Sequence, residues 1–355
     1  MRIIIDIGHP AHVHLFRFFT DGMIGKGHAV LFTYRKKEYE EYLLQKLGFA
    51  AVSLGRHRSS TAGKLYSLIT SVIKMYFVAR KFKPDLFLSH GSLIAAQASW
   101  LYRRPHIALE DTGNREQVRF YLPFTSVVLT SESFQDNYGP KQVRYNSFHE
   151  LAYLHPNYFI VDQSFKKRLG LAEDEKLIIV RFISWSASHE KGITGLSADE
   201  KTYLVTGLSK YGKVFISSES ALPENLSSFL YPLAPETIHQ AMANADLFIG
   251  EGATMASESC MLGTPAIYIN SQIAGTINAQ VRYGLVFQFF NYTGVTEKAV
   301  EILLDPESKI KFHRKRDRLL AEAIDLTRFL IWFIESWPES FNIVKADPDF
   351  KKRFI

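Results

Sequence analysis

Short apolar runs alternate with stretches of helical periodicity along this chain of 355 residues. β-branched and other apolar residues fill the runs, which turn residues such as Gly8 and Pro10 bound: 2–7, 29–33, 50–54, 86–88, 105–109, 126–129, 177–182, 214–217, 247–249 and 266–269. Runs of this kind are typical of strands buried in a parallel sheet. Their alternation with helices predicts an α/β protein with two doubly wound, Rossmann-like parallel-sheet domains that face a cleft.

The segment from Gly139 to Gln163 has few periodic signals and contains Pro140 and Pro156, as expected of a linker. We therefore expect an N-terminal domain over residues 1–150 and a C-terminal domain over 164–325. Each is long enough to bury its own core. Residues 326–355 are strongly apolar in part and are expected to form a helical tail that packs back on the body.

The stretch 245–270 predicts a short β-α-β unit. Its first strand ends at a glycine-bearing turn, and its helix ends at Gly263 with Pro265 just beyond. A helix N-terminus that follows a turn of small residues can bind a phosphate, and Glu258 stands one helical turn after Thr254. That spacing suits a nucleotide, with the carboxylate on the ribose. Ordinary turns and a solvated Glu258 explain the same spacing equally well, because a short glycine turn is a weak signal.

The pattern Ala-Asp-(apolar run)-Gly-x-Gly-Ala-x-x-x-x-Glu-x-x-x-x-Gly-x-Pro resembles a known nucleotide motif. It is similar to the donor motif of GT-B glycosyltransferases and of non-hydrolysing UDP-N-acetylglucosamine 2-epimerases. The resemblance implies that Glu258 binds the ribose and that Gly252, Ala253 and Thr254 receive the diphosphate. As a whole, the chain more closely resembles a widespread GT-B-like domain-of-unknown-function family, which implies the fold and leaves the reaction open.

A polar loop, residues 184–192, follows the first strand of the second domain. Arg181 and the backbone from Ser184 to Ser188 are candidates to hold the diphosphate from the side opposite Gly252. His189 lies close to the place where the 2-epimerases have a functional histidine, so it is a candidate contact for phosphate or sugar. A lone histidine in a loop is also typical of an ordinary surface residue.

Three histidines follow the first strand, where open α/β sheets bind ligands: His9, His12 and His14. They could bind a metal, act as a base, or be polar residues at a helix start. GT-B enzymes as a class hold no metal through the protein, so the resemblance implies neither metal nor cofactor. We favour His9 or His12 as a substrate contact or base.

Two further strand ends bring His90, Ser92, Glu110 and Asp111 to the same rim. The carboxylates of Glu110 and Asp111 are candidate general bases on an acceptor hydroxyl, and helix capping is the alternative. Glu110 matches a glutamate that the 2-epimerases use. Those enzymes have an aspartate where this chain has Ser92, after His90-Gly91, which argues against the same epimerisation.

Positive charge is concentrated in the first half of the chain. Residues 1–150 hold 20 Lys+Arg and 12 Asp+Glu, whereas 151–355 hold 22 and 24. This bias suits an acidic partner: an anionic membrane, a lipid-phosphate acceptor or, least of the three, nucleic acid, for which no reader motif appears. Between Ala62 and Lys83, apolar residues recur at helical spacing among Lys and Arg. Such a helix either covers the sheet or lies on a membrane.

The location follows from what the sequence lacks. The single cysteine, Cys260, fits a reducing compartment. The first strand begins at residue 2 and no apolar run is long enough to span a bilayer, so we expect neither signal peptide nor membrane span. These features predict a cytoplasmic protein, peripheral to the inner face of the membrane if its acceptor is lipid-linked.

Together the motifs favour a metal-independent GT-B glycosyltransferase that moves a sugar from a nucleotide diphosphate to a cell-surface polysaccharide or glycolipid. Uridine as the base comes from the resemblance alone. In this hypothesis the C-terminal domain binds the donor and a base from His9, His12, Glu110 or Asp111 removes the acceptor proton. Two alternatives stay open: an epimerase or hydrolase that acts on the nucleotide sugar itself, and a non-catalytic protein that binds a nucleotide sugar.

Overall fold

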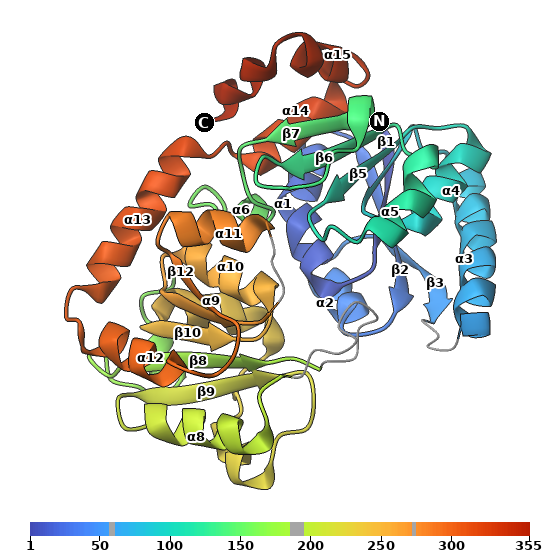
Figure 1. The fold of residues 1–355 in the computed structure, drawn as a ribbon. Coiled ribbons are helices and arrows are strands. Elements are labelled where there is room, and N and C mark those ends of the chain that lie inside the picture. The colour runs from blue at the N-terminus through green and yellow to red at the C-terminus, as the bar shows by residue number, and fades with distance from the viewer. Residues whose placement is uncertain (57–60, 185–194, 272–274) are drawn as a thin grey trace. The chain divides into compact units, whose positions relative to one another are not determined.

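The computed structural model of the chain describes residues 1–56, 61–184, 195–271 and 275–355, and it divides into two compact units (Figure 1). Unit 1 consists of Met1–Tyr153 and Ala323–Ile355, and unit 2 of Leu154–Glu322. The chain thus leaves unit 1 once and returns to it near the C-terminus. No helix among the described residues is long and apolar enough to cross a membrane.

Unit 1 is built on a seven-stranded sheet of order β3-β2-β1-β4-β5-β6-β7. Every pairing in it is parallel. The central strands are apolar and buried on both faces, as expected of a parallel sheet covered by helices. The strands are β1 (Arg2–Ile7), β2 (Ala29–Lys36), β3 (Ala51–Arg56), β4 (Leu86–His90), β5 (His106–Glu110), β6 (Val127–Ser131) and β7 (Gln142–Tyr145).

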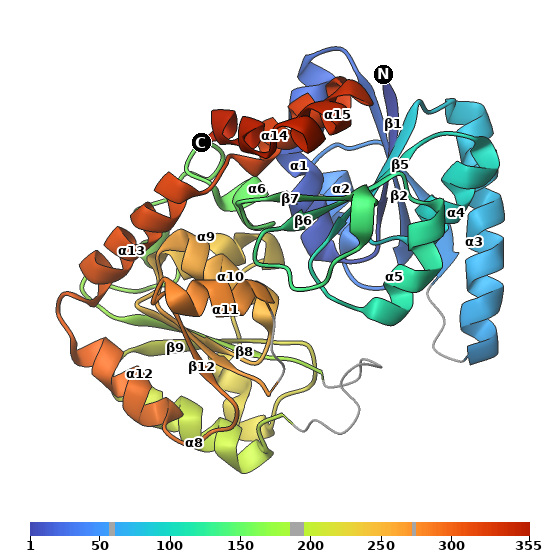
Figure 2. The same cartoon turned by 45° about the horizontal axis from the view of Figure 1, so that its top comes forward.

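The helices of unit 1 include two that come from the C-terminal segment. The helices are α1 (Pro10–Gly25), α2 (Glu40–Lys46), α3 (Thr61–Phe82), α4 (Leu93–Tyr102), α5 (Arg115–Tyr121), α14 (Leu326–Glu335), α15 (Glu339–Ala346) and α6 (Leu151–Leu154), whose last residue belongs to unit 2. Helix α14 packs beside α1 (Figure 2). At the C-terminal end of α14, Oε2 of Glu335 lies 2.5 Å from Nζ of Lys26, and its Oε1 lies 2.9 Å from Nε2 of His28.

The segment that the sequence suggested as a linker is partly structured. Within it, β7 forms the edge strand of the unit 1 sheet, and α6 begins at Leu151. Only four residues long, β7 is too short to show a periodic pattern of its own. Side chains from the C-terminal segment support it, since Lys345 and Lys351 donate to the carbonyls of Gln142 and Arg144.

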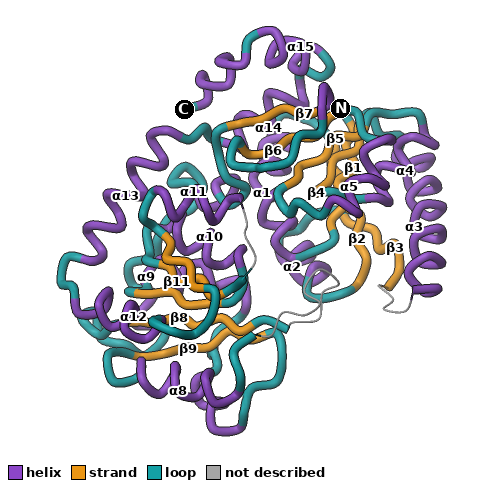
Figure 3. Tube along the Cα trace, viewed as in Figure 1, coloured by secondary structure: helices purple, strands orange, loops and turns teal. Residues whose placement is uncertain are grey.

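Unit 2 holds a five-stranded sheet of order β12-β11-β10-β8-β9, also parallel throughout (Figure 3). Its strands are β8 (Leu177–Phe182), β9 (Lys213–Ser218), β10 (Leu247–Gly250), β11 (Ala266–Ile269) and β12 (Val286–Phe289). Its helices are α7 (Phe165–Arg168), α8 (Ala198–Leu208), α9 (Ile238–Asn244), α10 (Ala253–Leu262), α11 (Gly275–Arg282), α12 (Val295–Leu304) and α13 (Ser308–Glu322). Apolar residues of β8, β9 and β10 and of α8 and α12 form its core.

Candidate functional site

In unit 1 the candidate catalytic side chains lie at the carboxyl ends of β1, β4 and β5. These strands are neighbours in the sheet, so the residues that follow them come together. His90 is the last residue of β4, and Asp111 directly follows β5. Nε2 of His90 lies 2.9 Å from Oδ1 of Asp111. A carboxylate can only accept, so His90 donates this hydrogen bond.

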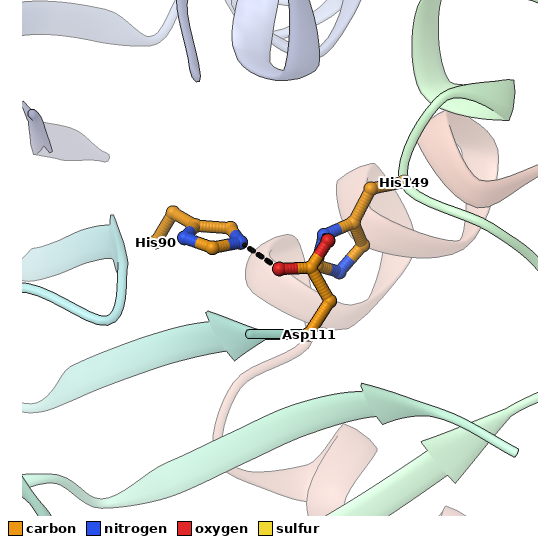
Figure 4. Close-up of side chains that lie close together, drawn as sticks. All are labelled: His90, Asp111 and His149. Carbon is orange, nitrogen blue, oxygen red and sulfur yellow. Dashed lines mark hydrogen bonds and ion pairs between the residues drawn. The ribbon is translucent and has the colours of Figure 1, made fainter. Parts of the chain in front are cut away.

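A second histidine, His149, contacts the other oxygen of Asp111. Its Nδ1 lies 3.0 Å from Oδ2 of Asp111, and its side chain is 7% exposed. The carboxylate therefore lies between two imidazole rings (Figure 4). His149 comes from the turn before α6, a region that we expected to be linker. No local pattern in the sequence indicates this contact, since His149 follows Asp111 by 38 residues.

His12, one of the predicted bases, stacks on His90 with a ring separation of 4.3 Å. The backbone N–H of Gly8 donates to Nδ1 of His12 at 3.2 Å, which leaves Nε2 to carry the ring proton. Burial and the neighbouring charge of His90 hold the pKa of His12 well below its usual value. His12 is therefore a neutral ring that can donate from Nε2.

His90 and Asp111 shift each other's pKa. Burial alone would lower the pKa of His90, but the charge and hydrogen bond of Asp111 raise it above the usual value. Burial would raise the pKa of Asp111, but His149 and His90 hold it well below the usual range. Asp111 is thus an ionised carboxylate that makes His90 a stronger base.

The side chain of His9, the other histidine that we favoured, is 44% exposed. Helix α1 begins at Pro10, because proline is well suited to the first helical position. His9 is the N-cap and its Nδ1 accepts from the N–H of Ala11 at 3.1 Å. Its Nε2 lies 3.6 Å from Glu38. His9 is 6.0 Å from the ring of His12, at the edge of the cluster.

Glu110, the other candidate carboxylate, is 2% exposed, and both of its oxygens accept hydrogen bonds. Its Oε1 accepts from the N–H and the hydroxyl of Thr112 at 2.8 and 2.5 Å, and its Oε2 accepts from the hydroxyl of Tyr121 at 2.6 Å. These contacts anchor the loop after β5 to α5. The geometry therefore favours Asp111 over Glu110 as the partner of a base.

Ser92, at the position where 2-epimerases have an aspartate, is the N-cap of α4. Its hydroxyl donates to Oδ2 of Asp6 at 2.5 Å, and the hydroxyl of Thr33 donates to Oδ1 at 2.7 Å. Asp6 is 5% exposed, and burial raises its pKa despite these hydrogen bonds. A carboxylate is therefore present beside Ser92, although it comes from β1.

Three side chains of the cluster form a set that could hold a metal ion. Ligand atoms of His90, Asp111 and His149 all lie within 4.8 Å of one another. Two imidazoles and one carboxylate are a common ligand set for transition metals. The separations of 2.9 and 3.0 Å also match direct contacts between imidazole and carboxylate, which need no ion.

In unit 2 the predicted phosphate turn is the start of α10, which begins at Ala253. Gly252 is its N-cap and offers no side chain to the first backbone N–H groups. Ala253 is partly exposed and Thr254 is exposed. Gly250 is required by packing, since a Cβ there would lie 2.7 Å from the Phe248 ring. This helix start is thus free of the side-chain cap that would compete with an anion.

Glu258 lies one turn further along α10 and is not the solvated residue of the alternative interpretation. Its side chain is 5% exposed, and Oε1 lies 2.9 Å from Nε2 of His239, which is 8% exposed. His239 comes from α9, the helix before the motif. We did not single it out in the sequence, because only the fold brings α9 against α10.

Arg181 and Ser184 share one partner, Glu219, which follows β9. Nη2 of Arg181 lies 2.6 Å from Oε1 of Glu219, and the N–H and hydroxyl of Ser184 both donate to Oε2 at 3.1 Å. Burial would raise the pKa of Glu219, but these partners lower it. The charge of Arg181 is thus balanced within unit 2. His189, the remaining predicted donor residue, lies outside the described residues.

Glu251, in the turn itself, holds the neighbouring loop. It is 1% exposed, and its two oxygens accept from the N–H groups of Ile183 at 3.2 Å and Leu196 at 2.7 Å. The carboxylate therefore links the turn before α10 to the segments on both sides of residues 185–194.

The two sheets and their helices resemble solved structures along most of the chain. A UDP-GlcNAc 2-epimerase from Neisseria meningitidis bound to UDP-GlcNAc has a TM-score of 0.67 at 14% identity, with 88% of this chain and 94% of that chain covered. A Streptomyces sp. SF2575 glycosyltransferase, SsfS6, complexed with thymidine diphosphate has a TM-score of 0.63 at 14% identity, with 94% and 99% covered. The chain therefore has the GT-B-like fold that glycosyltransferases and UDP-GlcNAc 2-epimerases share, as the sequence predicted.

Within this fold class, sequence comparison identifies the family. Residues 1–280 match the family described as "Protein of unknown function (DUF354)", and the chain belongs to that family. The uncharacterized protein MJ0665 of Methanocaldococcus jannaschii is 22% identical over an alignment of 280 residues that covers 74% of this chain and 80% of that protein.

Proposed function

We propose that this protein is a metal-independent glycosyltransferase that uses a nucleoside diphosphate sugar, with uridine as its base. The observation that carries the proposal is the start of α10: a helix N-terminus without a side-chain cap, followed one turn later by the buried carboxylate of Glu258. Backbone N–H groups there suit a diphosphate, and a carboxylate accepts hydrogen bonds from ribose hydroxyls. Two of the similar solved structures support this donor class, since one is bound to UDP-GlcNAc and the other is complexed with thymidine diphosphate.

His239 orients the carboxylate of Glu258 for this role. The contact of 2.9 Å fixes one oxygen of the carboxylate, so its rotamer is set before a ligand arrives. A ribose held there would place its diphosphate toward Gly252, Ala253 and Thr254. Arg181 and Ser184, which pair with Glu219, would reach the diphosphate on release from that carboxylate.

In the proposed reaction, unit 1 supplies the base. His90 takes the proton of an acceptor hydroxyl on Nδ1 while Nε2 donates to Asp111. The acceptor oxygen then bonds to the anomeric carbon of the sugar, and the bond from that carbon to the diphosphate oxygen breaks. The nucleoside diphosphate leaves with the electron pair, and the N-terminus of α10 stabilises its charge. His12, neutral and stacked on His90, orients the acceptor by donating from Nε2.

The acceptor in this proposal is a cell-surface polysaccharide or a glycolipid, and its recognition belongs to unit 1. The excess of Lys and Arg over Asp and Glu in residues 1–150 supports an acceptor that carries phosphate, as lipid-linked sugars do.

Donor binding can be tested directly by thermal unfolding with UDP, TDP, GDP and their sugars. A ligand that binds the folded state raises the melting temperature by mass action. We expect a selective rise with uridine nucleotides that Glu258→Ala abolishes. Glu297→Ala, an exposed glutamate on α12 of the same unit, is the matched control and should keep the rise. The proposal fails if no nucleotide at millimolar concentration shifts the wild type.

An epimerase that acts on the nucleotide sugar itself is the second candidate, and Asp6 is the observation in its favour. Its Oδ2 accepts a hydrogen bond from the hydroxyl of Ser92 at 2.5 Å, and Ser92 occupies the sequence position where the 2-epimerases have an aspartate. Incubation with UDP-N-acetylglucosamine and no acceptor separates the two functions. A transferase leaves the donor intact until an acceptor is added, whereas an epimerase produces the C2 epimer alone.

A further inference from the structure

The outer face of α3 is apolar where a helix of this kind normally has polar side chains. Leu65, Ile69, Ile73 and Phe77 are 61%, 52%, 49% and 60% exposed, and Tyr66 beside them is 58% exposed. Residues four apart lie on one face of a helix, so these side chains form a continuous stripe about 18 Å long. We call these five residues the α3 stripe.

The exposed apolar stripe is not the core-facing side of α3 turned toward solvent. The opposite face of α3 is well packed, since Val72, Met75 and Ala79 are buried in a cluster with Phe87 and Ile94. The helix therefore has one apolar face for the core and a second that no described residue covers. An amphipathic helix on a globular protein has polar residues on its second face.

Positive charge is concentrated around the stripe. Residues 61–104 contain seven Lys+Arg and one Asp+Glu residue, whereas the rest of the chain contains 35 Lys+Arg and 35 Asp+Glu. The excess of Lys and Arg over Asp and Glu in this region equals the net charge of the whole chain, +6. Among the seven Lys and Arg, six of those whose side chains the structure describes are exposed: Lys74, Arg80, Lys81, Lys83, Arg103 and Arg104. Within the described parts of the chain none of these six forms an ion pair, and the one aspartate, Asp85, accepts from the backbone N–H of Arg2 at 2.8 Å.

Helix α4 extends this surface. It packs on α3, with the rings of Tyr76 and Tyr102 6.2 Å apart, and it exposes Trp100 and Leu101 by 60% and 48%. A hollow of about 810 Å³ lies at the end of α4, and its lining includes Trp100, Arg103 and Arg104. An aromatic ring beside two guanidinium groups suits a lipid phosphate and its glycerol backbone.

We propose that the α3 stripe docks unit 1 on an anionic lipid membrane. Apolar side chains enter the boundary between headgroups and acyl chains, and the surrounding Lys and Arg pair with acidic headgroups. Charge separates this occupant from a second copy of the chain, because two such surfaces would bring their excess cations together. The inference deepens the proposed function, since a membrane-bound enzyme would meet a lipid-linked acceptor, but it depends only on unit 1.

Vesicle sedimentation with the full-length protein tests the inference without any nucleotide. We expect little binding to phosphatidylcholine vesicles and strong binding to vesicles of equal parts phosphatidylcholine and phosphatidylglycerol. Each Lys or Arg near an anionic surface contributes about fivefold to the partition coefficient. Arg80→Gln with Lys81→Gln should therefore lower it roughly 30-fold. Lys210→Gln with Arg314→Gln, two exposed cations of unit 2, should leave it unchanged.

The apolar part is tested by Ile69→Ser with Phe77→Ser, which should abolish binding that survives in moderate salt. The control is Leu304→Ser with Ile310→Ser, because these unit 2 residues are exposed to a similar degree, 61% and 56%. Both pairs should keep the wild-type melting temperature, since none of the four side chains is in a core.

Three results would overturn the inference: no binding to anionic vesicles at low salt, binding that the α3 variants do not change, or a dimer that the same variants dissociate while vesicles are ignored. A failure of the proposed function would look different. In that case vesicle binding would persist and no nucleotide would shift the melting temperature.

Discussion

His90 and Asp111 lie 2.9 Å apart although 21 residues separate them in the chain. The contact exists because β4 and β5 are parallel neighbours, with His90 opposite Leu109 in the register. The two side chains therefore leave the sheet at the same edge, where the charge of Asp111 raises the pKa of His90. A fixed pair of this kind allows a prediction about the pH dependence of turnover.

Asp111→Asn should lower kcat by about 10²- to 10⁴-fold, the usual contribution of a positioned base. The base form of His90 is present only above its pKa, so wild-type activity should rise with pH through a midpoint above 6.5. Without the negative charge of Asp111 this midpoint should move to lower pH, although His12, His149 and Glu110 remain nearby. A kcat profile against pH measures both effects. Asp136→Asn, which breaks a surface pair with Arg115, is the control and should change neither; an unmoved midpoint in Asp111→Asn would assign the base elsewhere.

Gly252→Asp should separate folding from donor binding. Aspartate is a good N-cap, so α10 should keep its stability, with a small adjustment because the new Cβ would lie 3.2 Å from Ile183. The carboxylate would occupy the place proposed for the diphosphate and repel it by several kcal/mol. We expect at least a 100-fold loss of affinity for UDP in calorimetry, whereas Gly252→Ser, a neutral cap, should lose much less. Equal affinities in the two variants would show that no anion binds there.

His106 should make unit 1 sensitive to acid. It is 0% exposed, lies between the hydroxyls of Ser89 and Thr125 at 2.9 Å each, and burial lowers its pKa to about 3. The unfolded chain binds a proton near pH 6.5, so between pH 6.5 and about 3 the unfolded state binds more protons than the folded state. Stability is therefore complete above pH 6.5 and should fall by a few kcal/mol as the pH drops to 3.

Urea unfolding at a series of pH values, with and without His106→Asn, measures this effect. The variant should be less stable at pH 7 and should have a shallower slope between pH 6.5 and 3. Parallel slopes for the two proteins would assign the acid sensitivity to other groups.

The fold could be predicted from the sequence because its signals are local. β-branched runs such as residues 2–7 identify strands, and the motif from 245 to 270 identified the GT-B-like class, which the comparisons confirm. The site could be predicted only in part. Strand ends gave His90, Glu110 and Asp111, but spacing could not say that Glu110 is bound to Thr112 and Tyr121.

Partners from elsewhere in the chain carried no local signal. His149 and His239 become visible only when the chain folds, since one contacts Asp111 from a turn 38 residues later and the other contacts Glu258 from the preceding helix. The C-terminal helices are a similar case. Their apolar pattern predicted packing on the body, but which surface they cover depends on the tertiary structure.

Phe329 of α14 is 0% exposed and contacts the rings of Tyr145, Phe333 and Phe354, so it joins the C-terminal segment to the edge of the unit 1 sheet. Phe329→Ala should cost about 3–5 kcal/mol of unfolding free energy, because it removes a large buried ring and leaves a cavity. Ile343→Ala, at a 37% exposed position of α15, should cost less than about 1 kcal/mol. Hydrogen exchange locates the effect: faster exchange in β7 and α1 with unit 2 unchanged is expected if α14 belongs to unit 1, whereas faster exchange confined to unit 2 would refute that assignment.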